Sequence, residues 1–272
     1  MPRIKAKNIT MNYEQQGTGE PLILIPYLAA DHACYAFQVP AYANHFTCIS
    51  IDLRGTGESD KPDGDYSIEL LADDVAAFMQ AAGIQKAHVT GLSLGAAVGM
   101  WMAAKYPDRV KSLSLHGCWP KTDPFIRTVL EGWQLVARTL DSVPETVIRA
   151  MFPWCFTPEL YAAKPDYIES LAAFVRGRPA QTVTSYIQQS NAVLTHDAEA
   201  QLGRITAPTQ ITCGQYDRLT STRFAEPMQR GIRDSELLVF AGCAHAPLYE
   251  HVEEFNDKTL DFLKRHAGLG TS

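Results

Sequence analysis

The sequence lacks any long apolar run, and no stretch approaches the roughly 18 residues that a membrane-spanning helix needs. Its first seven residues, MPRIKAK, lack the apolar core of a signal peptide. Basic residues are outnumbered by acidic ones: the sequence has 24 Lys and Arg and 30 Asp and Glu, which gives a net charge of −6. We therefore expect no membrane and no nucleic acid as partner, and we expect a cytoplasmic protein.

Motifs for metal and nucleotide binding are also missing. The eight histidines show no His-Glu-x-x-His or other ligand spacing, and the six cysteines contain no Cys-x-x-Cys pair. No third glycine of a dinucleotide fingerprint follows Gly55-x-Gly57, so we interpret that segment as a structural loop. The sequence predicts no catalytic metal, no cofactor, and six reduced, mostly buried thiols.

What the chain does contain is a regular alternation of strand and helix patterns over 272 residues, of which 46% are hydrophobic. Continuous apolar runs are typical of strands that helices cover on both faces of a sheet. The sequence therefore predicts an α/β fold with a mostly parallel eight-stranded sheet and helices on both faces. The expected strands are 3–9, 10–16, 21–25, 46–51, 86–90, 110–115, 209–214 and 236–242.

The alternation stops between residues 118 and 196, where prolines break the pattern into several short helices. We expect this segment to be a helical lid, inserted after the sixth strand of a core made of residues 1–117 and 197–272. Three of the four tryptophans lie in it, and we expect Trp119 and Trp154 to contact a substrate.

The most informative motif is Gly91-Leu92-Ser93-Leu94-Gly95, which lies between a strand-like run and a helical run of small residues. Gly-x-Ser-x-Gly in this context is typical of a nucleophile elbow, in which the serine backbone is strained. Side chains at the two glycine positions would collide with the neighbouring strand and helix. Ser93 is therefore the candidate nucleophile.

Such a serine needs a histidine as base and a carboxylate that orients the histidine. Both follow the serine along the chain, the carboxylate first and the histidine second. Asp217 comes just after the predicted strand 209–214, and His245 comes just after 236–242. Ser93, Asp217 and His245 thus all follow the carboxyl ends of strands, the edge of a parallel sheet where ligands bind.

Each assignment has an alternative. Asp217 stands beside Arg218 and could be an ordinary turn aspartate. His251 is the nearest rival to His245, but it falls at the start of the last predicted helix. A catalytic acid after the predicted strand 110–115 is disfavoured, because the segment 117–119 that follows this strand contains no carboxylate.

With these residues in place, the chain resembles the α/β-hydrolase superfamily over essentially its whole length. The segment 52–59, DLRGTGES, is similar to the loop after the fourth strand of these enzymes, and segments 28–31, 65–68 and 82–84 resemble 3-oxoadipate enol-lactonases and aminoacrylate hydrolases. The family loop after the third strand usually begins His-Gly, and here the pair is Pro26-Tyr27. The resemblance implies an oxyanion hole formed by the backbone N–H groups of Leu28 and Leu94.

We therefore interpret the chain as a serine hydrolase of small carboxylic esters or lactones. A serine at the elbow argues against the dehalogenase and epoxide-hydrolase branches, which use a carboxylate nucleophile. Two alternatives stay open: an amide or carbon–carbon bond hydrolase with the same triad, and a non-catalytic ligand-binding protein on this fold. The sequence leaves the oligomeric state open, a homodimer included.

Overall fold

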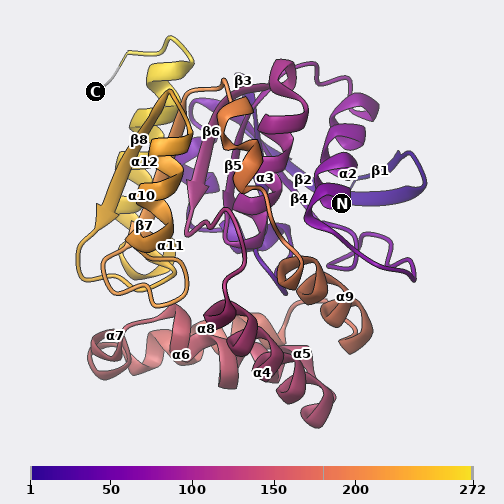
Figure 1. Cartoon of the computed structure of the whole chain (residues 1–272), viewed down its shortest axis with the longest axis vertical. Helices are drawn as coiled ribbons and strands as arrows, with labels where there is room; N and C mark the ends of the chain where they lie inside the picture. The colour runs from indigo at the N-terminus through magenta and orange to yellow at the C-terminus, as the bar shows by residue number, and fades with distance from the viewer. Residues whose placement is uncertain (1, 180, 271–272) are drawn as a thin grey trace.

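The computed structural model describes residues 2–179 and 181–270, and its centre is one eight-stranded sheet (Figure 1). The strand order is β1-β2-β4-β3-β5-β6-β7-β8. Only the pairs β1–β2 and β2–β4 are antiparallel, so the sheet is mostly parallel, as predicted. The strands are β1 (Arg3–Ala6), β2 (Ile9–Gln16), β3 (Glu20–Ile25), β4 (Phe46–Ile51), β5 (Ala87–Leu92), β6 (Val110–His116), β7 (Thr209–Gly214) and β8 (Ser235–Phe240).

Helices cover both faces of this sheet. Helix α2 (Ile68–Ala81) packs against α3 (Leu94–Lys105), and the 3-10 turn Glu199–Arg204 joins α3 to α10 (Thr222–Gly231). On the other face α1 (Val39–Tyr42) contacts α12 (Val252–His266), which follows α11 (Pro247–Glu250). Strands between two such layers must be apolar on both sides, and β5 is buried at every position.

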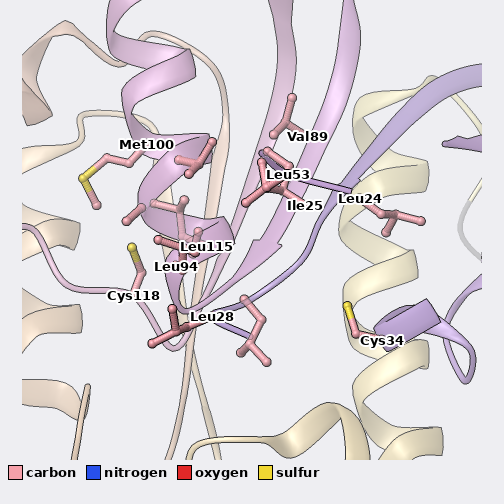
Figure 2. Close-up of a cluster of buried hydrophobic side chains, with 14 of the residues drawn as sticks. Leu24, Ile25, Leu28, Cys34, Leu53, Val89, Leu94, Met100, Leu115 and Cys118 are labelled. Atoms are coloured by element: carbon pink, nitrogen blue, oxygen red, sulfur yellow. The ribbon is translucent and has the colours of Figure 1, made fainter. Parts of the chain in front are cut away.

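The hydrophobic core therefore lies between the central strands and these helices. Figure 2 shows Leu24 and Ile25 of β3, Val89 of β5, and Leu94 and Met100 of α3 within one cluster of buried side chains. Burying such a side chain contributes about 1.5–3 kcal/mol. Because the cluster joins β3, β5 and the start of α3, it holds the turn between β5 and α3 rigidly in place.

Between β6 and β7 the chain forms a helical insertion, which gathers at one end of the sheet (Figure 1). A proline stands in the first turn of each of its first five helices, where a missing N–H costs nothing. The helices are α4 (Pro124–Leu140), α5 (Val143–Thr146), α6 (Phe152–Cys155), α7 (Pro158–Ala163), α8 (Pro165–Arg176) and α9 (Val183–Leu194), with one π-helical turn at Val147–Met151.

In the part of the chain that the structure describes, no helix is both long enough and apolar enough to cross a membrane.

Candidate active site

Ser93 occupies the turn between β5 and α3 in a strained backbone conformation, with φ 53° and ψ −117°. Positive φ is rare for a residue other than glycine, and it marks the elbow that the sequence predicts. A Cβ atom at Gly91 would meet the backbone of Gly95 and Ala96, and one at Gly95 would meet the carbonyl oxygens of Ile25 and Pro26. Both glycines are therefore required by close backbone packing.

His245 and Asp217 lie in hydrogen-bond contact. The Nδ1 atom of His245 is 2.8 Å from Oδ2 of Asp217, and both side chains are almost completely buried. Because Nδ1 is engaged by the carboxylate, the opposite ring nitrogen, Nε2, is left for proton transfer. This arrangement fixes the tautomer and orientation that a general base needs.

Asp217 is held as a carboxylate by its surroundings. Burial opposes its ionisation, but the charge and hydrogen bond of His245, together with Thr220, outweigh burial and lower the pKa of Asp217. Its Oδ1 accepts the N–H groups of Leu219 and Thr220, each at 2.8 Å, and the Thr220 hydroxyl donates to Oδ2 at 2.8 Å. The same hydroxyl lies 3.1 Å from Nδ1 of His245. Thr220 thus joins acid and base, a role that the sequence analysis missed.

Ser93 and His245 line one cavity of about 800 Å³, a volume that includes open solvent at its mouth. Leu28 and Leu94 line the same cavity, so the candidate nucleophile, the candidate base and both candidate oxyanion donors share one cavity wall. Leu94 is the first residue of α3, and the N–H groups of a first helical turn have no acceptor within the helix. The remaining lining is almost wholly apolar and includes Tyr27, Trp133, Met151, Phe152, Phe156 and Tyr249.

The two tryptophans expected at the substrate differ in position. Trp119 lines the cavity, and its Nε1 donates to the hydroxyl of Thr122 at 2.9 Å. Trp154 is not among the lining residues, and its ring packs on Phe125 and under the guanidinium of Arg218. The structure thus places the Trp154 ring against these two neighbours and outside the wall of this cavity.

The rival residues lie elsewhere. His251 begins α12 with Nδ1 3.3 Å from Glu254 and is not part of the cavity wall. Cys155 is among the lining residues, but burial raises the pKa of its thiol to about 12, so the thiol stays protonated.

Asp31, His32 and Asp52 form the one group of three metal-type ligands found among the described residues. Asp52 is already engaged, because Oδ1 accepts from both N and Nδ1 of His32 at 2.7 Å. Its Oδ2 accepts from Asn12 and Glu58, each at 2.9 Å. These four bonds use the lone pairs that a cation would need, so the group is a structural network that ties two loops together.

Known proteins resemble this chain over most of its length. A family model described as the alpha/beta hydrolase fold matches residues 20–252. RutD of Azorhizobium caulinodans, which is named as a carbamate hydrolase, is 28% identical over 268 residues and aligns over 96% of this chain and 98% of its own. The 3-oxoadipate enol-lactonase 2 of Acinetobacter baylyi is 26% identical, with 96% of each chain covered.

Among solved structures, an enol-lactonase from Burkholderia xenovorans superposes with a TM-score of 0.87 at 24% identity, covering 97% of this chain and all of that one. A likeness at that identity shows the fold. Because the family model covers most of the sequence, from β3 to the start of α12, the chain belongs to the alpha/beta-hydrolase family and is a hydrolase.

Proposed function

We propose that this chain is a serine hydrolase that cleaves small carboxylic esters or lactones through an acyl-enzyme on Ser93. The observation that carries the proposal is one cavity whose wall contains both the strained Ser93 and the Asp217-bound His245. A serine hydroxyl is a weak nucleophile on its own, so an oriented histidine must accept its proton during attack.

In this mechanism Nε2 of His245 takes the Ser93 proton as the hydroxyl oxygen bonds to the acyl carbon. The N–H groups of Leu28 and Leu94 stabilise the oxyanion, each contributing about 2.7–4 kcal/mol. His245 then gives the proton to the leaving alcohol, and Asp217 stabilises the imidazolium in between. Water attacks the acyl-enzyme with His245 again as base, which releases the acid and restores Ser93.

The cavity supports a neutral and compact acyl group. Among the described residues, no Lys, Arg, Asp or Glu lines this cavity, so a charged acyl chain would be buried without a partner, at a cost of several kcal/mol. Residues of the helical insertion form much of the wall, including Ile126, Leu130 and Trp133. We therefore propose that residues 118–196 act as a lid that shapes the acyl site. The six cysteines are all unpaired, which supports a reducing compartment such as the cytoplasm.

A second candidate is hydrolysis of a carbon–nitrogen bond, which the relative named as a carbamate hydrolase favours. The two reactions share the nucleophile, the base and the oxyanion hole, so they differ in leaving group. A substrate panel separates them: p-nitrophenyl esters of rising acyl length, enol-lactones, and aryl amides and carbamates with the same acyl parts.

The proposal is tested first with a fluorophosphonate probe and peptide mass spectrometry. The probe should phosphonylate Ser93 of the wild-type protein, and Ser93→Ala should lose labelling and at least 10⁴-fold in turnover. Ser235→Ala is the control, because that serine begins β8 and lies outside the cavity wall. Labelling at another residue, or more than about a hundredth of turnover left in Ser93→Ala, would remove Ser93 from the mechanism.

A further inference from the structure

Tyr27 lines three separate cavities, and it is the one described residue that all three share. The first is the active-site cavity. The second lies between the loop after β3 and helices α5 and α8, and its wall includes Asp31, Arg178 and Gln181. The third is an apolar hollow between Phe37 and Phe174. The ring of Tyr27 thus stands where these spaces would otherwise merge.

Hydrogen bonds hold this ring in place. The Tyr249 hydroxyl donates to the carbonyl oxygen of Cys34 at 2.7 Å, and the Tyr27 hydroxyl lies 2.9 Å from that of Tyr249. A carbonyl oxygen can only accept, so the single hydroxyl hydrogen of Tyr249 is used there, and Tyr27 must donate to Tyr249. Burial raises the pKa of both phenols well above the usual value, so both hydrogens stay in place.

The wall between the first two cavities is thin. Of the residues that the structure describes, only Tyr27 and Val147 are common to both, whereas Tyr27, Phe152, Phe156 and Tyr249 are common to the first cavity and the third. Removing the Tyr27 ring would therefore open the active site mainly toward the second cavity. Its wall is apolar at Val143, Pro144 and Val175, and it holds the ion pair between Arg178 Nε and Asp31 Oδ2 at 2.8 Å.

Tyr27 directly precedes Leu28, one of the proposed oxyanion donors, and both residues line the first cavity. Its ring therefore stands close to the part of that cavity where we expect the acyl carbon.

We propose that Tyr27 is the specificity-determining residue of this enzyme and that its ring limits the acyl chain to lengths that fit the first cavity. The inference rests on the proposed ester or lactone hydrolysis. The ligands that the ring excludes are long straight-chain acyl groups, which would cross into the second cavity.

The test measures binding, so that it does not depend on turnover. Butanamide and octanamide are titrated by calorimetry into Ser93→Ala protein that carries Tyr27, Tyr27→Ala or Tyr27→Phe. Each methylene that enters apolar space strengthens binding by up to roughly fourfold. The preference for octanamide over butanamide should rise at least tenfold in Tyr27→Ala and stay within twofold in Tyr27→Phe, which keeps the ring.

Val147→Ala opens the same wall from the other side and should shift the preference in the same direction, which keeps the test decisive should Tyr27→Ala fail to fold. An unchanged ratio in folded Tyr27→Ala, or in Val147→Ala when Tyr27→Ala does not fold, would overturn the proposal. The kcat/KM ratio for octanoyl over butyryl esters, measured with Ser93 intact, should follow the same order. A wild-type enzyme inert on every ester and lactone would refute the proposed function, whereas the binding ratios would still decide the role of Tyr27.

Discussion

Gly117 lies directly against the imidazole of His245, so that a Cβ atom built on Gly117 would be 3.0 Å from Cε1 and 3.2 Å from Nδ1. The backbone at Gly117 has φ +53°, a conformation that side chains disfavour. The Gly117 N–H donates to the carbonyl oxygen of Thr212 at 2.8 Å, which fixes the end of β6 beside β7. The loop after β6 therefore forms one wall of the site that holds the His245 ring.

The substitution Gly117→Ala should displace that ring slightly and lower kcat, by at most about 100-fold, which is the cost of a misplacement near 1 Å in an active site. The measurement is steady-state hydrolysis of a short p-nitrophenyl ester together with a thermal melt. Gly132→Ala is the control, because no atom lies within 4 Å of a Cβ there. That change should leave kcat unaltered and stabilise α4 by about 0.8–1 kcal/mol. Normal turnover in a folded Gly117→Ala protein would contradict the importance of this contact.

Asp217→Asn should reduce turnover about 10⁴-fold, because an amide favours the wrong imidazole tautomer. Asp257→Asn, an exposed change on α12, serves as the control and should leave turnover unchanged. Near-normal turnover in Asp217→Asn would move the acid to another residue.

Thr220→Val tests the residue that bridges acid and base. Valine keeps the shape of threonine but lacks the hydroxyl, which donates to Asp217 and lies 3.1 Å from His245 Nδ1. Loss of a hydrogen bond to a charged group costs about 1.5–3 kcal/mol, so kcat should fall about 10- to 100-fold while KM changes little. Thr220→Ser is the matched control, because it keeps the hydroxyl and should therefore retain most of kcat. Equal losses in both variants would show that Thr220 acts by packing alone.

The pH dependence of stability should be dominated on the acid side by buried histidines, of which His116 is the clearest. Burial lowers the pKa of His116 to about 3, and its ring nitrogens face only the hydroxyls of Thr90 and Thr212, each at 2.9 Å. No carboxylate among the described residues balances a charge there, so His116 stays neutral in the folded protein, while the unfolded chain binds a proton below about pH 6.5. Its contribution to stability is thus complete above pH 6.5 and is lost as the pH falls toward 3.

Urea unfolding at several pH values measures this loss. Between pH 6 and 4, the free energy of unfolding of the wild type should fall by about 1.4 kcal/mol per pH unit more than that of His116→Asn. Parallel profiles for the two proteins would show that His116 is protonated in the folded state.

The strands and the proposed triad were predictable from the sequence because each rests on local patterns. Short apolar runs predicted the strands, and Ser93, Asp217 and His245 each come after one of these strands. Asp217 also caps its own turn through the N–H of Thr220, which the local spacing Asp-x-x-Thr could have suggested.

The sequence predicted that the insertion is helical, but it did not predict which of its side chains are buried. Helices α5, α6 and α7 are too short for a periodic pattern to show which face is buried, so packing decides where their side chains point. Tyr27 shows the same limit, because its position between three cavities depends on residues more than 100 positions away, such as Val147 and Tyr249.

The tryptophans of the insertion give a matched pair for testing the lid. Trp119 lines the active-site cavity, whereas Trp154 lies against Arg218, with the guanidinium 4.9 Å from the ring centroid. Trp119→Ala should therefore enlarge the acyl site and move the optimum of kcat/KM toward longer p-nitrophenyl esters, each added methylene contributing about 0.8 kcal/mol while space remains. Trp154→Ala should leave the optimum at the wild-type length. Thermal melts control for the loss of packing, since replacing a buried tryptophan costs about 3–5 kcal/mol. If a folded Trp119→Ala protein kept the wild-type dependence on acyl length, the lid would have no role in selecting the acyl group. A shift of the optimum in Trp154→Ala alone would place the acyl site on the side of α6 where Trp154 lies.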